Sequence, residues 1–256
     1  MKLYKYRAIT SSDGDAFPRL SEILGKNEFW CASPAALNDP EEFIWECDYA
    51  PTVRTAALLV ELFVKYRGHD SATAKMLASH AISEGRIEFI ARPVIQSIID
   101  QSREEIGVAC FGTSADSLVM GQCYGGEGVG VCIEIQVPDE LLGDQLHRVE
   151  YQAIKRLHLD ELLQASLDGS NNREVYSMSL LSKGANWTAE QEVRFISKRQ
   201  NIAVQISGSY ISRLILGPCL DGATIERLRE LVASLSYELP LVPSALNMQK
   251  QANTTK

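Results

Sequence analysis

The chain has 256 residues, of which 45% are hydrophobic and 23% charged, a mixture typical of a globular protein with a full core. Its formal net charge of −8 argues against broad electrostatic capture of nucleic acid or of an anionic membrane, and leaves room only for a nucleic-acid substrate held in one local groove. No apolar run approaches the roughly 20 residues that span a bilayer, and the N-terminus does not resemble a signal peptide, so we expect a cytoplasmic protein.

The first part of the chain combines short strand patterns with one long helical region. Residues 17–24 have the apolar spacing of a helix, which we expect to end at Gly25. From residue 53 to residue 99, apolar side chains recur three and four positions apart, which predicts about three consecutive helices. Alternating or continuous apolar runs predict strands at residues 3–6, 29–32 and 106–111.

The rest of the chain is richer in strand patterns. Asp116 is expected to cap a short helix that runs to Tyr124, and the glycines that follow turn the chain into a strand. Helices are also predicted at residues 154–167 and 173–181, and from the cap Asp221 to about residue 235. Strands are predicted at residues 129–137, 147–151, 193–197, 202–206, 211–216 and 239–242.

These elements predict one α+β domain over residues 1–246, with a mixed, mainly antiparallel central sheet. A helical insertion is expected at about residues 52–103, and residues 247–256 are expected to form a flexible polar tail. The six cysteines form no Cys-x-x-Cys pair, and the four histidines show no ligand spacing with them. We therefore expect no metal site, and thiols that behave as small hydrophobic groups.

The sequence Trp187-x-x-Glu190-x-Glu192-x-Arg194 carries the most informative polar pattern. In a strand, residues two apart lie on one face about 6.5–7 Å from each other, so the carboxylates and the guanidinium would form one row. Two carboxylates at that distance repel by about 2.4 kcal/mol at an effective dielectric constant of ~20, enough to raise one pKa by more than about one unit if no cation intervenes. Arg194 offsets this repulsion, so the row fits either a reactive edge or a self-satisfied ion cluster.

Two other segments, both rich in turn residues, have a structural and a functional interpretation. Asn38 and Asp39 precede Pro40, which is typical of a turn and also of a polar loop held over a site. The glycine-rich residues 125–130 do not fit a phosphate-binding loop, because a strand rather than a helix is predicted to follow them. No Gly-x-Ser-x-Gly motif and no convincing Ser–His or Cys–His dyad occurs, so the candidates for a nucleophile are weak.

Several short blocks spread over residues 3–217 form an ordered series. The first are Leu3-Tyr4-Lys5-Tyr6-Arg7, Phe29-Trp30-x-x-Ser33-Pro34 and Leu37-Asn38-Asp39-Pro40-x-Glu42. The later ones are Cys110-Phe111, Leu118-Val119-Met120, Tyr124, Gly130-Val131-Cys132-Ile133-Glu134, and Lys183 followed by the Trp187 to Arg194 motif. In this order and spacing, the blocks resemble the bacterial DUF-2971 family, a domain of unknown function.

The layout of that family is similar to NAD-dependent ADP-ribosyltransferase folds, including DNA-modifying toxin relatives. The resemblance therefore implies NAD as co-substrate, with Glu192 as the carboxylate beside the ribose, Glu190 acting on the acceptor, and Arg194 in the same catalytic row. It implies that Arg7 holds the dinucleotide phosphates, where a planar guanidinium suits bidentate contact. The residues expected to bind substrate or cofactor are Tyr4, Tyr6, Arg7, Trp30, Ser33, Asn38, Asp39, Tyr124 and Trp187.

The chain departs from the family pattern in its central block. The family has Trp and His where this chain has Gly121 and Cys123, and a His-basic pair where this chain has Gly128 and Val129. A non-enzymatic interaction or sensing module, with a protein partner in a phage-defence or stress operon, is therefore an equal alternative. A metal-dependent nuclease is a weaker one, because Arg194 stands where that chemistry needs Lys, and an always-charged guanidinium is no general base.

Overall fold

The computed structural model describes residues 1–9, 16–39, 45–143, 145–151, 155–168 and 180–245. The chain divides into two compact units, each built from segments that lie far apart in the sequence. The sheet unit comprises residues 1–32, 107–149 and 186–256, and the helical unit comprises residues 33–106 and 150–185. Among the described residues, no helix is long and apolar enough to cross a membrane.

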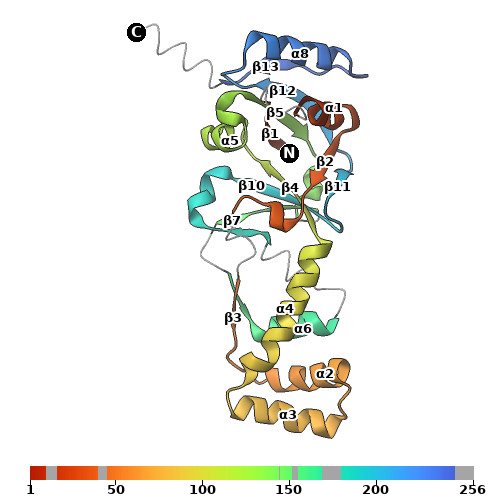
Figure 1. Ribbon diagram of the computed structural model, residues 1–256, viewed down its shortest axis with the longest axis vertical. Helices are drawn as coiled ribbons and strands as arrows, with labels where there is room; N and C mark the ends of the chain where they lie inside the picture. Colours follow the sequence, from red (N-terminus) through yellow and green to blue (C-terminus); the bar gives the residue numbers. More distant parts are fainter. Residues whose placement is uncertain (10–15, 40–44, 144, 152–154, 169–179, 246–256) are drawn as a thin grey trace. The chain divides into compact units, whose positions relative to one another are not determined.

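The sheet unit contains a seven-stranded sheet with the order β13-β12-β5-β1-β4-β10-β6 (Figure 1). The strands β12 and β13 pair in parallel, whereas the other neighbouring strands pair antiparallel. This arrangement confirms the predicted α+β fold with a mixed, mainly antiparallel sheet. The strands are β1 Lys2–Ala8, β4 Gly107–Gly112, β5 Gly130–Gln136, β6 Leu146–Arg148, β10 Glu192–Ser197, β12 Tyr210–Leu216 and β13 Leu241–Pro243.

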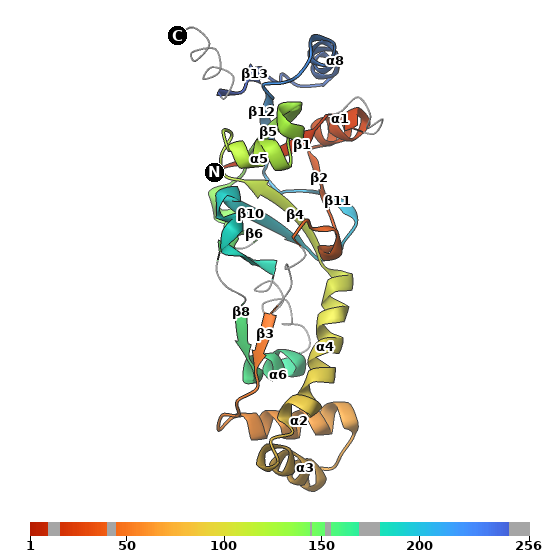
Figure 2. The same cartoon turned by 60° about the vertical axis from the view of Figure 1, so that its left-hand side comes forward.

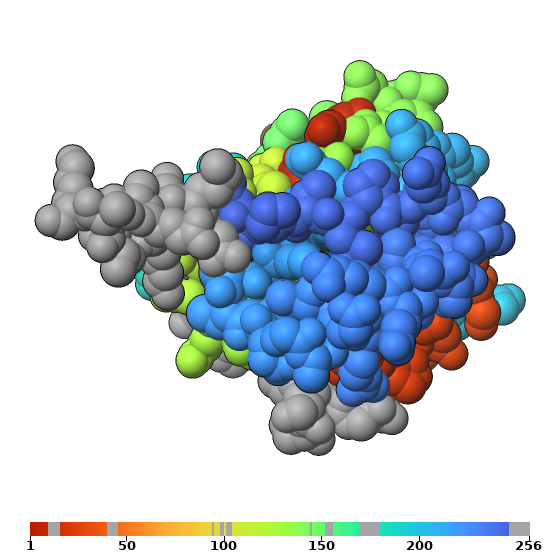
Figure 3. All heavy atoms as spheres, turned by 90° about the horizontal axis from the view of Figure 1, so that it is seen from above, coloured from red at the N-terminus to blue at the C-terminus, as the bar shows by residue number. Residues whose placement is uncertain are grey.

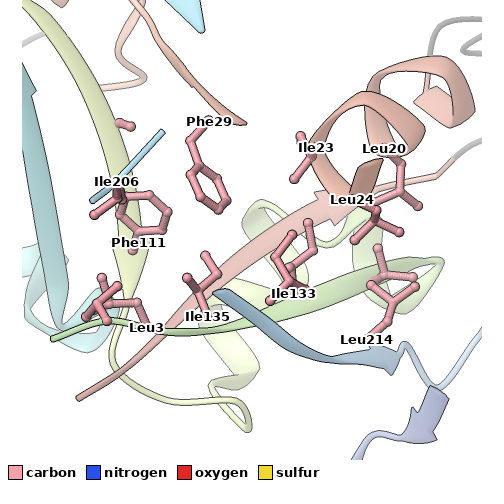
Figure 4. Close-up of a cluster of buried hydrophobic side chains, with 14 of the residues drawn as sticks. Leu3, Leu20, Ile23, Leu24, Phe29, Phe111, Ile133, Ile135, Ile206 and Leu214 are labelled. Atoms are coloured by element: carbon pink, nitrogen blue, oxygen red, sulfur yellow. The ribbon is translucent and has the colours of Figure 1, made fainter. Parts of the chain in front are cut away.

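The main core lies on one face of this sheet. The helix α1 (Ala16–Lys26) buries Leu20, Ile23 and Leu24, which share one side of a helix because they are three and four positions apart. Figure 4 shows these side chains facing Ile133 of β5 across the core. Phe29 lies on β2 (Glu28–Cys31), which pairs with β11 (Ile202–Gln205) in a second, two-stranded sheet.

The helix α8 (Gly222–Ala233) adds Leu228 to the same core. Its residue Arg227 lies over the ring of Phe17 in α1, with the guanidinium carbon 3.9 Å from the ring centroid. The Tyr237 hydroxyl also donates to the Leu24 carbonyl, at 2.7 Å. The C-terminal part of the chain, drawn in blue, therefore covers much of the face seen in Figure 3.

A smaller cluster lies on the other face of the sheet. Successive residues of a strand point to opposite faces, so Leu3 of β1 joins the main core while Tyr4 and Tyr6 turn away from it. The short helix α5 (Leu118–Cys123) covers these tyrosines with Met120. Three short 3-10 helices lie at its connections: η2 Gly126–Gly128, η3 Asp139–Leu141 and η4 Ala185–Glu190, whose first residue belongs to the helical unit.

The helical unit contains the expected insertion as three helices, α2 (Thr55–Arg67), α3 (Ser71–Ser83) and α4 (Ile87–Glu105), together with α6 (Leu159–Asp168). Asp160 at the start of α6 accepts a hydrogen bond of 2.6 Å from the hydroxyl of Thr55, which ties α6 to the start of α2. The strands β3 and β8 lie side by side in parallel (Figure 2). The remaining elements are η1 Pro34–Ala36, β3 Trp45–Asp48, β8 Lys155–His158, β7 Glu150–Tyr151 and β9 Ser182–Lys183.

Two helix boundaries predicted before residue 145 are wrong. The helix α1 continues through Gly25, and the chain leaves it at Asn27, whose φ of 53° lies in the left-handed region that asparagine tolerates. The cap of α5 is Ser117 rather than Asp116. The Ser117 hydroxyl accepts from the Met120 amide at 3.2 Å, which satisfies a free amide of the first turn.

The region from residue 145 to residue 181 also differs from the prediction. The single strand predicted at 147–151 is two strands, β6 and β7, which pair in different sheets. The helix predicted at 154–167 begins only at Leu159, because the preceding residues pair with β3 as β8. Most of the helix predicted at 173–181, and the tail at 247–256, lie outside the described residues.

Candidate functional site

The predicted row of three charged side chains is interrupted by a backbone turn. Glu190 is the last residue of η4, and β10 begins at Glu192. Between them, Gln191 has a φ of 45°, a left-handed conformation that costs a residue with a Cβ roughly 1–2 kcal/mol. The prediction that Glu190 and Glu192 share one strand face is therefore wrong, because Glu190 does not belong to the strand.

Glu192 and Arg194 do lie on one face of β10, as their two-residue spacing predicts. The guanidinium donates through Nε to Glu192 Oε1 at 3.0 Å and through Nη2 to Oε2 at 2.9 Å. Arg194 is fully buried and Glu192 is 5% exposed. Such a bidentate pair orients the carboxylate and neutralises it, which corresponds to the ion-cluster alternative for this motif.

Glu190 has a different partner. Its Oε1 accepts a hydrogen bond of 2.7 Å from the hydroxyl of Tyr124, the residue that follows α5. Tyr124 also packs against the cluster that contains Tyr4 and Tyr6. The structure thus brings together four of the predicted site residues, from β1, the end of α5 and the end of η4. Trp187 lies three residues before Glu190 in the same 3-10 helix.

The predicted stacking residues Tyr4 and Tyr6 are buried beneath α5. The Tyr4 hydroxyl donates to Glu134 at 3.2 Å, and the Tyr6 hydroxyl donates to the Ser114 carbonyl at 2.9 Å. Burial raises the pKa of both phenols, and in Tyr4 the neighbouring Glu134 charge adds to the effect. A ligand would therefore reach either ring only after α5 had moved. Arg7, on the same strand, is half-buried.

The other predicted binding residues lie elsewhere. Trp30 is on β2, in the second sheet of the sheet unit, and is 55% exposed. Ser33, Asn38 and Asp39 belong to the helical unit, where Ser33 precedes η1 and Asp39 is buried. Pro40 and the four residues after it lie outside the described residues, so the reading of this loop as a cover over a site stays a prediction.

A buried carboxylate that the sequence analysis did not single out is Glu134, in the middle of β5. It accepts 2.8 Å hydrogen bonds from the Ser212 hydroxyl and from Arg213 Nε, and it lies 3.3 Å from Lys2 Nζ. Desolvation opposes its ionisation, but these hydrogen bonds and cations outweigh it and lower the pKa of Glu134. A lone glutamate within the apolar run of β5 was the signal that could have identified it.

An irregularity in β12 creates this second cluster. The register between β12 and β5 shifts between Ile211 and Arg213, which inserts one extra residue. Ser212 and Arg213 would point to opposite faces in a regular strand, yet both reach Glu134. The bulge therefore re-aims two neighbouring side chains onto one carboxylate.

Lys5 and Cys110 form a further polar contact beside β10. The Lys5 ammonium donates to the Cys110 carbonyl at 2.8 Å. Burial lowers the pKa of Lys5, because desolvation disfavours the charged ammonium. Burial and the nearby Glu192 charge raise the pKa of the Cys110 thiol, so this cysteine is not a reactive thiolate.

The positions that depart from the family pattern lie around α5. A Cβ at Gly121 would meet no atom within 4 Å, so a side chain could begin there without a clash. Gly128 has a φ of 92° and packs against Pro218, which favours glycine there. A cavity of about 30 Å³ beside Gly121 and Tyr6 is the size of a single water molecule and excludes a nicotinamide ring.

Within the part of the chain that the structure describes, no three His, Cys, Asp or Glu side chains gather as a metal site would require. Comparison with known proteins adds no assignment. No family model, no curated protein and no solved structure matches the chain.

Proposed function

We propose that the chain is an NAD-consuming enzyme of the ADP-ribosyltransferase type, with its reacting edge at Glu190 to Glu192. The observation that carries this proposal is a pair of buried carboxylates on either side of the left-handed residue Gln191. Each carboxylate has a donor that orients it, Tyr124 for Glu190 and Arg194 for Glu192. Buried, oriented charges next to backbone strain are more frequent at reactive sites than elsewhere in a fold.

The chemistry needs a fixed negative charge beside a ribose. When the bond between nicotinamide and C1′ breaks, the ribose develops oxocarbenium character, which a preorganised carboxylate stabilises. Glu192 would have this role, since Arg194 holds both of its oxygens in place. The acceptor would then attack C1′ and pass its proton to Glu190, while Arg7 holds the dinucleotide phosphates.

The experiment is to incubate the full chain with NAD and to follow nicotinamide release by chromatography, with NAD binding measured by calorimetry. We expect Glu192→Gln to lower the release rate by about 100-fold or more, because it removes charge stabilisation of the transition state. Glu226→Gln, in the exposed ion pair with Arg229 on α8, is the matched control and should not change the rate. A wild-type chain that neither binds nor consumes NAD would overturn the proposal.

A non-enzymatic interaction or sensing module is the second candidate. The bidentate contact between Glu192 and Arg194 favours it, because both charges already satisfy each other inside the fold. In that case Glu192→Gln would change the stability of the chain. Its cellular effect would fall only as far as the amount of folded protein falls. Retention of a stable partner protein by the Glu192→Gln chain would then favour the module over the enzyme.

A further inference from the structure

We propose that the groove formed by α2, α3 and α4 in the helical unit binds an acidic amphipathic segment of a partner protein. Figures 1 and 2 show these three helices together. The groove belongs to one unit, and none of its residues takes part in the site proposed for NAD. This interaction therefore goes beyond the proposed enzymatic function and is independent of it.

The floor of the groove is apolar and the groove is large. It has a volume of about 1090 Å³, at the upper limit of small-molecule sites, which span about 300–1,000 Å³. Phe63 of α2, Leu77 of α3, and Phe89 and Ile90 of α4 line it. Phe89 is 72% exposed, although removal of a phenylalanine side chain from water is favourable. The size and the exposed ring suit a peptide segment better than a small ligand.

The charges that line the groove are opposite in sign to those of the whole chain. Among the described residues, Arg67, Arg86 and Arg92 line it together with one acidic residue, Glu88, so three positive charges minus one negative charge leave +2 with histidines neutral. The chain as a whole has a net charge of −8. A basic groove on an acidic protein would select an acidic segment by charge complementarity.

The guanidinium groups lie where an incoming carboxylate would meet them. Arg86 stacks over the Phe89 ring, 5.5 Å from its centroid, and its other neighbour Glu84 is 3.8 Å away, so its charge is only loosely compensated. Arg67 is exposed and has no ion pair with any described residue. Arg92 pairs with Glu88 one helical turn earlier. Two of the three arginines can therefore take new partners without a buried pair being broken.

The backbone hydrogen bonding of α4 is interrupted at the same place. Pro93 lies inside α4 and has no N–H to donate to the carbonyl of Phe89, four residues earlier. Both residues line the groove.

Apolar residues flanked by guanidinium groups match an amphipathic helix that places apolar side chains in a groove and carboxylates along its rim. No lysine of the described part of the chain lines the groove, and Glu84 and Glu88 border it, which disfavours the phosphate backbone of a nucleic acid.

The test is to select peptides from a random displayed library against the full chain, with peptides of about 16 residues, long enough for roughly four helical turns. We expect the enriched peptides to combine Asp or Glu with apolar residues three and four positions apart. Their affinity for the Arg67→Glu/Arg86→Glu chain should fall at least about tenfold. A chain with Lys26→Glu and Arg229→Glu, two exposed positions of the sheet unit, is the charge-matched control and should bind like the wild type.

A second variant, with a smaller change, distinguishes a loss of binding from a loss of folding. Phe89→Ala should also weaken the selected peptides about tenfold, because it removes an exposed ring without changing the charge. Both groove variants should keep the circular dichroism spectrum of the wild type. The proposal is overturned if no peptide is enriched, if the enriched peptides are basic or lack acidic residues, or if the groove variants bind them unchanged. It is also overturned if a single-stranded oligonucleotide or phosphatidylserine vesicles, and not peptides, bind in a way that depends on Arg67 and Arg86.

Discussion

Two carboxylates of the sheet unit, Glu134 on β5 and Glu192 on β10, are almost equally buried but are held in different ways. The cations that hold Glu134 reach water, since the side chains of Lys2 and Arg213 are 49% and 38% exposed. The guanidinium that holds Glu192 is sealed, because the side chain of Arg194 is 1% exposed. The loss in the free energy of unfolding when an arginine–glutamate pair is broken therefore depends on whether its cation is hydrated.

The reason is the cost of removing an ion from water. A cation that remains partly hydrated loses little when its partner is removed, because solvent screens the charge that is left. In a pair that is sealed from water, removal of one partner leaves a buried charge that solvent does not screen. The same difference bears on function, since the sealed pair fixes the position of Glu192 more firmly than the solvated cations fix Glu134.

The largest effect is expected for Arg194→Met. It leaves Glu192 as a buried charge without its bidentate partner, so we expect the free energy of unfolding, measured by urea denaturation, to fall by about 3–5 kcal/mol. The matched control Arg213→Met should cost only about 1 kcal/mol, because Lys2, Ser212 and Tyr4 still contact the carboxylate of Glu134. The double variant Glu192→Gln/Arg194→Met should recover part of the loss. Equal losses in the two single variants would contradict the comparison.

A smaller effect is expected for Glu134→Gln, and it should depend on pH. The folded chain lowers the pKa of Glu134, so the ionised carboxylate adds stability above the unfolded-state pKa. That contribution is lost as the pH falls through the folded-state pKa. We expect the variant to be less stable by about 1–2 kcal/mol near neutral pH, with the difference shrinking in acid. The free energy of unfolding of both chains is measured in urea from neutral pH to about pH 3. A difference between the chains that stays constant with pH would exclude a role for the ionisation of Glu134.

The smallest effect is expected for Gln191→Gly. Glycine adopts a φ of 45° without the steric cost that glutamine bears, so relief of strain should raise the free energy of unfolding by about 1 kcal/mol. Asn201→Gly is the control, because Asn201 has a similar φ of 55° and asparagine tolerates that region. Its stability should change by less than about 0.5 kcal/mol. Thermal denaturation of both variants tests whether the strain resides at Gln191.

Elements determined by local chemistry were predicted well. Asp221 accepts the Thr224 amide at 2.7 Å and starts α8 at the expected position, because a cap and its helix need only neighbouring residues. The apolar run at residues 106–111 was predicted as a strand, and it forms β4 between β1 and β10. The three insertion helices also follow from apolar spacing within each helix.

Elements that depend on distant partners were predicted poorly. Residues 147–151 have one continuous strand pattern, yet β6 pairs with β10 and β7 pairs with β9 in another sheet. The strand β8 was predicted as helix, since its pairing with β3 cannot be read from its own residues. Strand assignment depends on cross-strand partners, which lie far away in the sequence.

The candidate site divides in the same way. The sequence by itself determined that Glu192 and Arg194 share a face, because alternation in a strand is a local property. Only the tertiary structure decided that Glu190 leaves that face, since nothing in Glu-Gln-Glu signals a left-handed residue and the hydroxyl of Tyr124 comes from another part of the chain. It also decided that Arg194 is sealed, because burial depends on what packs against a strand from elsewhere in the fold.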